Sequence, residues 1–275
     1  MINETIPEIA ENRFLIPYKD GFLPAIKLEP SSKPKDIIVW HGGFDSLLEE
    51  MYPMLKIFCD AGFLIIAFEG PGQGGALRTH NLKMTYDWEK PISVVLDFFD
   101  VKKCVLIGMS LGGYMSLAFY YKYPEMVDSL LIIDTGPGFK NAEAREGWNN
   151  YALKQAKKFD EVGLDSLIGK SKEMNPLNHR NAKGLVHAAK GMLTQKDDRI
   201  INELPNIKVP SLIVVGEHDK PFLAAADYME KKIKNSIKII TKMLQWLKVF
   251  KKLLMQQKTI KIHSLSEEEK FIKLL

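Results

Sequence analysis

Short runs that are apolar on both faces recur from residue 36 onward, and stretches with helical spacing lie between them. A strand that is apolar on both faces is typical of a parallel sheet that helices cover on each side. The alternation therefore predicts an α/β fold with a mostly parallel sheet and right-handed crossovers. Before it, residues 13–28 predict an antiparallel hairpin that turns at residues 19–21. The predicted strands are 36–43, 62–70, 103–108, 129–134 and 210–216, and the predicted helices are 47–60, 85–99 and 111–123.

The alternation is interrupted between residues 135 and 205, where no buried-strand pattern occurs. Residues 142–159 and 182–194 have helical spacing instead. An insertion of helices between two strands is a usual place for a cap over a site. We therefore expect a core in two parts, residues 1–134 and 206–275, with a helical cap at residues 135–205.

The composition excludes several classes of protein. The chain has 275 residues, of which 46% are hydrophobic, so its core needs neither a metal nor a disulfide. No apolar run reaches the ~18 residues of a membrane span, and the first residues lack the apolar stretch of a secretory signal. Cys59 and Cys104 lie in apolar segments and are expected to be buried thiols, which favours a reducing compartment. We therefore expect a cytoplasmic protein.

The net charge of +4 is unevenly distributed. Residues 231–275 contain 12 lysines and three acidic residues, whereas the other 230 residues contain 26 basic and 31 acidic side chains. The body of the protein is therefore acidic. It offers no broad basic face, so we expect no nucleic-acid partner.

A strand–turn–helix pattern surrounds Ser110, in the sequence Gly108-Met109-Ser110-Leu111-Gly112. A serine on a sharp turn between a strand and a helix needs small residues two positions before and after it, because larger side chains collide with the strand and helix. The N–H groups at the start of the helix then face the serine oxygen and stabilise negative charge. The G-x-S-x-G pattern also arises by chance, but the apolar strand before it and the helix after it favour a nucleophilic serine.

Four segments together resemble the α/β-hydrolase family of the Ser-His-Asp kind, over about residues 10–230. The resemblance implies an α/β-hydrolase fold, in which Ser110 attacks a substrate carbonyl. The N–H groups of Leu111 and Gly43 would bind the oxyanion, with Phe44 the next candidate, and Asp219 would orient the catalytic imidazole. A helix N-cap ahead of Pro221 is the other interpretation of Asp219. The four segments are His41-Gly42-Gly43-Phe44, the loop from Glu69 to Gly75, the serine turn, and Gly216-Glu217-His218-Asp219.

The last predicted strand is residues 237–240, and the general base is harder to assign because the family's Gly-His does not follow that strand. The only histidine after Asp219 is His263, 44 residues later, in a short strand-like segment before a run of acids. The order Ser110, Asp219, His263 is the order that this fold uses. Catalytic and non-catalytic roles for His263 both stay open. His41 is expected to hydrogen-bond the local backbone, and surface or packing roles are expected for the others, His80, His179, His187 and His218.

The lysine-rich tail has three interpretations. Residues 231–266 contain ten lysines and no acid, and residues 240–254 have the apolar spacing of an amphipathic helix. The helix could pack on the sheet, the tail could come from a shifted reading frame, or the basic helix could contact an anionic membrane surface or a partner groove. We prefer these in that order. An aberrant tail would leave an inactive binding protein without a competent histidine.

The sequence gives little support for a nucleotide-binding site or a metal site. Residues 70–75 match G-x-G-x-x-G, but Pro71 lies inside the turn and residues 78–81 predict continued loop, so no helix would begin there to hold a pyrophosphate. No metal-ligand spacing of histidines or cysteines occurs. We therefore expect no cofactor and no metal. The predicted activity is a serine hydrolase that cleaves an ester, an amide or a carbon–carbon bond next to a carbonyl in a small molecule, which cap residues such as Trp148, Tyr151 and Met192 would select.

Overall fold

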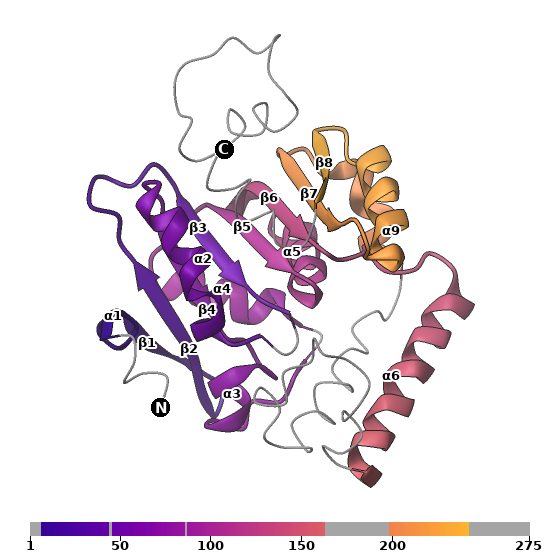
Figure 1. The fold of residues 1–275 in the computed structure, drawn as a ribbon, viewed down its shortest axis with the longest axis horizontal. Helices are drawn as coiled ribbons and strands as arrows, with labels where there is room; N and C mark the ends of the chain where they lie inside the picture. Colours follow the sequence, from indigo (N-terminus) through magenta and orange to yellow (C-terminus); the bar gives the residue numbers. More distant parts are fainter. Residues whose placement is uncertain (1–6, 44–45, 86, 163–197, 242–275) are drawn as a thin grey trace.

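The computed structural model describes residues 7–43, 46–85, 87–162 and 198–241. Within them, one eight-stranded sheet carries helices on both faces (Figure 1). The strands lie in the order β1-β2-β4-β3-β5-β6-β7-β8. Their bounds are β1 (Arg13–Tyr18), β2 (Gly21–Leu28), β3 (Ile37–His41), β4 (Leu64–Phe68), β5 (Cys104–Met109), β6 (Val127–Ile133), β7 (Ser211–Gly216) and β8 (Ser236–Thr241). The helices are α1 (Pro7–Glu11), α2 (Leu48–Asp60), α3 (Gly74–Arg78), α4 (Glu89–Phe98), α5 (Leu111–Lys122), α6 (Ala142–Val162), α8 (Arg199–Glu203) and α9 (Lys220–Lys232), with short 3-10 turns η2 (Pro124–Met126) and η5 (Leu204–Asn206).

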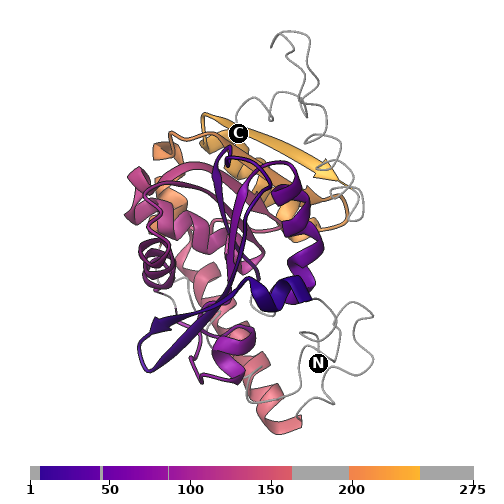
Figure 2. The same cartoon turned by 90° about the vertical axis from the view of Figure 1, so that its left-hand side faces the viewer.

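The sheet is parallel from β4 to β8, and only the hairpin strands β1 and β2 run antiparallel to their neighbours. The hairpin pairs Arg13 with Ile26 and Tyr18 with Gly21, so the chain turns at residues 19–20 as predicted. Figure 2 shows the twist that the sheet accumulates between this hairpin and β8. The predicted α/β architecture is confirmed.

Alternate residues of each central strand enter two separate cores. In β5, Val105 and Ile107 face the core under α2, whereas Leu106 faces the core under α4, α5 and α9. All three are at most 1% exposed. This burial on both sides explains why the central strands are apolar on both faces. The prediction that Cys59 and Cys104 are buried is also confirmed.

Helix α4 begins four residues later than the predicted residue 85. Trp88 immediately before it is fully buried, and a Cβ on Gly70 would lie only 2.5 Å from its ring. The indole is therefore fixed against the loop after β4, which holds the preceding chain out of the helix. Pro91 lies in the first turn, where a proline costs no intrahelical hydrogen bond.

The loop predicted after the glycine-rich turn was wrong in part, because residues 74–78 form the short helix α3. The buried carboxylate of Glu69 accepts a hydrogen bond from the Gly75 N–H at 2.6 Å. The first N–H groups of a helix have no acceptor within the helix, and the Glu69 side chain supplies one for α3. The sequence pattern gave no sign of this contact.

The inserted segment contains α6, which extends three residues past the predicted residue 159 and lies away from the sheet (Figure 1). The predicted helix at residues 182–194 lies outside the described residues. So does most of the predicted tail helix, although Ile240 belongs to β8 and not to a helix. In the described part of the chain, no helix is long and apolar enough to cross a membrane.

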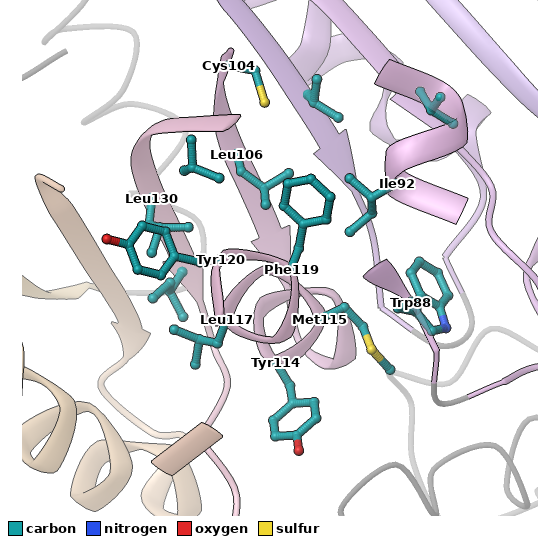
Figure 3. Close-up of a cluster of buried hydrophobic side chains, with 14 of the residues drawn as sticks. Trp88, Ile92, Cys104, Leu106, Tyr114, Met115, Leu117, Phe119, Tyr120 and Leu130 are labelled. Atoms are coloured by element: carbon teal, nitrogen blue, oxygen red, sulfur yellow. The ribbon is translucent and has the colours of Figure 1, made fainter. Parts of the chain in front are cut away.

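The serine-bearing helix α5 is anchored by a cluster of buried side chains. Figure 3 shows the ring of Phe119 between Leu106 of β5 and Ile92 of α4. Phe119 is fully buried, whereas Tyr121 on the same helix is 41% exposed.

We expect Phe119→Ala to lower the free energy of unfolding by about 3–5 kcal/mol, because it removes a buried ring and leaves a cavity. Urea denaturation followed by circular dichroism would measure the change. Tyr121→Ala is the matched control and should cost less than about 1 kcal/mol. Equal losses for the two variants would contradict this description of the core.

Candidate active site

Ser110 lies between the end of β5 and the start of α5, with φ 54° and ψ −124°. A non-glycine residue rarely adopts a positive φ, so the turn holds this serine in a strained conformation. The Ser110 N–H donates to the Ile133 carbonyl at 2.8 Å, which ties the turn to the end of β6. The residue is partly exposed at the carboxyl edge of the sheet. Ser110 is therefore not part of the buried core.

Two glycines permit this turn, as the sequence predicted. A Cβ on Gly108 would lie 2.2 Å from the Gly112 carbonyl oxygen and 2.4 Å from the Ser116 hydroxyl. A Cβ on Gly112 would lie 2.6 Å from the carbonyl oxygens of His41 and Gly42. Both distances are too short for any side chain, so the strand, the helix and the 41–43 turn meet backbone to backbone.

The two predicted oxyanion donors flank the serine. A Cβ on Gly43 would lie 3.1 Å from the Ser110 Cβ and 3.5 Å from its Oγ, so the Gly43 backbone lies against the hydroxyl. Leu111 is the first residue of α5, and an N–H at that position has no acceptor within its own helix. Phe44, the third candidate, lies outside the described residues.

Asp219 occupies the N-cap position of α9 at the carboxyl end of β7. The N-cap interpretation of Asp219 is therefore confirmed for its position. Burial raises the pKa of Asp219, and the negative charge of Asp134 raises this pKa further. The N–H of Phe222 acts in the opposite direction but more weakly.

Asp134 is a second carboxylate at this edge that the sequence analysis missed. It follows β6 with φ 44°, and its Oδ1 accepts a hydrogen bond from the Gly216 N–H at 2.7 Å. A Cβ on Gly216 would lie 3.7 Å from both Asp134 Oδ1 and Asp219 Cβ, so the two acids flank that glycine. Burial raises the pKa of Asp134, and the Gly216 N–H opposes that shift. The available signal was an acid directly after a buried strand.

Glu69 is a third carboxylate, and it has a structural role. It is 3% exposed, and it accepts hydrogen bonds from the Gly75 N–H at the start of α3 and the Leu48 N–H at the start of α2, the latter at 3.2 Å. Burial raises the pKa of Glu69, while the two N–H groups act to lower it. One buried side chain therefore caps two helices beside the glycine turn at residues 42–43.

His41 is a structural histidine. It is fully buried, and burial lowers its pKa to about 3. His41 Nε2 and the Ser116 hydroxyl form a buried hydrogen bond of 3.1 Å, and the same hydroxyl lies 3.1 Å from the Gly112 carbonyl oxygen. The expectation that His41 bonds the local backbone was wrong, because its partner is a side chain of α5.

The other described histidines lie elsewhere. His80 packs against Phe22 with ring centroids 5.2 Å apart, and His218 is exposed beside Glu217. In residues 7–43, 46–85, 87–162 and 198–241, no imidazole forms a hydrogen bond with Ser110. The predicted base His263 lies outside the described residues, as do His179 and His187. The same described ranges contain no cluster of histidine, cysteine and acidic residues that could hold a metal.

Comparisons with known proteins agree with this architecture. A model of the alpha/beta hydrolase fold family matches residues 36–171. Over 126 residues, the chain is 37% identical to the 20-hydroxy-prefusarin hydrolase FUS2 of Gibberella moniliformis, a match covering 38% of this chain and 29% of FUS2. Over 120 residues, it is 38% identical to the hydrolase LUC6 of a Fusarium species, covering 37% of this chain and 28% of LUC6. The chain therefore spans less than a third of the length of these curated relatives.

Solved structures extend the likeness over most of the chain. MenH from S. aureus aligns with a TM-score of 0.68 and 21% identity, over 84% of this chain and 96% of that one. The enol-lactonase from Burkholderia xenovorans LB400 aligns with a TM-score of 0.66 and 16% identity, over 85% of this chain and 95% of that one. At these identities the likeness shows the fold alone, and it confirms the predicted fold class.

We expect Gly108→Ala to destabilise the protein by about 3 kcal/mol or to prevent folding, because the added methyl would overlap the Gly112 carbonyl oxygen. Thermal denaturation would measure the loss. Gly147→Ala is the matched control on α6, where an added Cβ meets nothing within 4 Å, and it should gain roughly 0.5–1 kcal/mol. A Gly108→Ala variant as stable as the wild type would contradict the described turn.

We expect Asp134→Asn to raise the melting temperature at pH 7, with a gain that vanishes near pH 3.5. The folded state raises the pKa of Asp134 above its ordinary 3.8, so it binds the proton more tightly than the unfolded state. Wild-type stability therefore falls as pH rises through that raised pKa, while asparagine keeps the acceptor for Gly216 and carries no charge.

The control for this experiment is Asp97→Asn, which changes an exposed carboxylate on α4. Melting curves at several pH values would compare each variant with the wild type. A difference between Asp134→Asn and the wild type that stays constant with pH would contradict the expected charge effect.

Proposed function

We propose that this chain, a member of the α/β-hydrolase fold family, is a serine hydrolase that cleaves an ester, an amide or a carbon–carbon bond next to a carbonyl in a small molecule. One observation carries the proposal. Ser110 is held at φ 54° on a strand-to-helix turn at the edge of the sheet, with the Gly43 backbone against its hydroxyl. A serine with only a packing role has no need of this strained conformation.

In the proposed mechanism, the Ser110 oxygen attacks the substrate carbonyl as its proton passes to a base. The carbonyl oxygen becomes an oxyanion, and the N–H groups of Gly43 and Leu111 donate to it. The leaving group departs with a proton from the base. Water then attacks the acyl-enzyme by the same route and releases the acid.

The proposed triad is completed by Asp219 and His263. Asp219 follows β7 at the carboxyl edge of the sheet and its side chain is partly exposed, so its carboxylate is accessible to an imidazole. A carboxylate in this role orients the imidazole and stabilises the cation that forms on it. His263 is the one histidine that follows Asp219 in the chain. Asp134 lies on the same edge and adds negative charge beside Asp219.

We also propose that residues 135–205 form a helical cap that selects the substrate. In α6, Trp148 lies between Phe139 and Tyr151, with ring centroids 6.3 Å and 5.8 Å apart. Phe139 and Tyr151 are 39% and 52% exposed. These rings offer an apolar aromatic surface for the body of an organic substrate. Met192, the other residue proposed for this role, lies outside the described residues.

The names of relatives support acyl-bond hydrolysis. FUS2 and LUC6 are named as hydrolases, and the Burkholderia protein is an enol-lactonase. A lactone is a cyclic ester, and an acyl-serine route opens it by the steps given above.

A catalytically inactive binding protein is the second candidate. His41 lies in the turn at residues 41–43, but burial lowers its pKa to about 3. It is therefore neutral near pH 7 and cannot accept the serine proton, which favours a binding protein. If His263 does not reach Ser110, the same fold and cap would bind a small molecule without cleaving it.

We expect a fluorophosphonate probe to label the wild type on one serine, because it phosphonylates a serine that has a working base. Intact-mass spectrometry would detect the adduct. Labelling should be lost in Ser110→Ala and fall at least about 100-fold in rate in His263→Ala. Ser93→Ala, which changes an exposed serine on α4, should label like the wild type. A folded wild type that stays unlabelled would favour the binding protein.

A further inference from the structure

Gln73 is a buried amide that the proposed mechanism does not use, and it joins two loops beside the serine. It is 2% exposed. Its Nε2 donates to the carbonyl oxygen of Gly42 at 3.0 Å and also to that of Gly43, and its Oε1 accepts from the Gly70 N–H at 2.8 Å. We infer that Gln73 is a positioning residue that aims the Gly43 N–H at the oxyanion. This inference rests on the proposed function.

Peptide geometry connects the amide to the oxyanion donor. The described residues contain no cis peptide, so the Gly42 carbonyl and the Gly43 N–H point in opposite directions across one planar group. By holding the Gly42 carbonyl, Gln73 turns the Gly43 N–H to the other side of that plane. Ser110 packs against Gly43, with 3.5 Å between its Oγ and the position of a Gly43 Cβ. The amide therefore fixes the rotation of the peptide that borders the nucleophile.

This control matters because both residues that share this peptide are glycines. Gly42 and Gly43 adjoin each other, and glycine has the largest choice of backbone conformations. A donor that acts on an oxyanion is effective only if it is oriented before the charge forms. The Gly43 carbonyl also accepts from the Ser46 N–H at 3.2 Å, but that bond does not act on the Gly42–Gly43 peptide.

The loop that carries Gln73 is itself rigid. The Gln73 N–H donates to the Gly70 carbonyl at 3.0 Å, and a Cβ on Gly74 would lie 1.9 Å from the Glu69 carboxylate. Gly70 lies against the buried ring of Trp88. The loop therefore holds the Gln73 amide in one position, and both polar atoms of this amide form hydrogen bonds with backbone groups.

The chemistry of the amide predicts which replacements fail. Glutamate has the same shape and keeps an acceptor for the Gly70 N–H, but it loses the donor and directs an oxygen at two carbonyl oxygens. Methionine has a similar length and loses the donor without adding charge. Both changes release the Gly42 carbonyl, and only the first adds repulsion.

The test measures hydrolysis of p-nitrophenyl acetate and labelling by a fluorophosphonate in the full chain. We expect Gln73→Met to lower kcat about 10- to 100-fold with KM within about twofold, and to slow labelling in parallel, since loss of a whole oxyanion donor costs about 10²–10³ in kcat. Gln73→Glu should be slower still. Melting temperatures within a few degrees of the wild type would show that the variants fold.

Asn235→Asp is the matched control, since its amide donates to the Lys208 carbonyl at 2.8 Å on the surface. It should leave kcat and labelling unchanged. A folded Gln73→Met variant with a wild-type kcat and labelling rate would overturn the inference.

A further measurement separates this inference from the proposed function. If the wild type neither hydrolyses the ester nor takes the probe, the proposed function fails. Amide hydrogen exchange in the segment 37–43 then tests the positioning alone. Faster exchange at Gly43 in Gln73→Met supports it, and unchanged exchange there, also in a folded Gln73→Glu variant, overturns it.

Discussion

The close approach of backbone to backbone at the serine turn is the constraint on which the rest of the site depends. The Gly112 carbonyl comes so near the Gly108 Cα that even a methyl group would overlap it. This contact brings the start of α5 against the end of β5 and forces the residue between them to a positive φ. It also lets the turn at residues 41–43 touch the first turn of α5. Ser110 is thus partly exposed at the edge of the sheet because the residues two positions before and after it have no side chains.

A second layer of buried polar groups keeps this arrangement in place. Glu69 caps α2 and α3, Gln73 holds the turn at residues 42–43, and His41 bonds Ser116 on α5. Buried polar groups are costly unless they are hydrogen-bonded, so each of these side chains tolerates few alternative backbone positions. The loops around the serine are therefore specified by polar bonds as well as by apolar packing.

The strands, the hairpin, most of α2 and α5, and the serine turn could be predicted because each depends on local pattern. The bonds that escaped prediction join residues far apart in the chain. The start of helix α3 depends on the carboxylate of Glu69. His41 bonds Ser116, which lies 75 residues further along the chain, and Asp134 bonds the N–H of Gly216 on another strand. A pattern of residue types carries no signal of such contacts. Ile240 was ambiguous for another reason, since a lysine-rich apolar segment satisfies both helical and strand spacing over a few residues.

The topology of the last two strands also bears on the proposed triad. Strand β8 is parallel to β7, so its last residue, Thr241, lies at the same carboxyl edge as Ser110 and Asp219. The Thr241 carbonyl accepts from the Glu217 N–H at 3.0 Å, two residues before Asp219. Thr241 therefore lies beside the loop that carries the proposed acid. Because His41 is fully buried and burial lowers its pKa to about 3, a triad built on Ser110 and Asp219 would need a different imidazole.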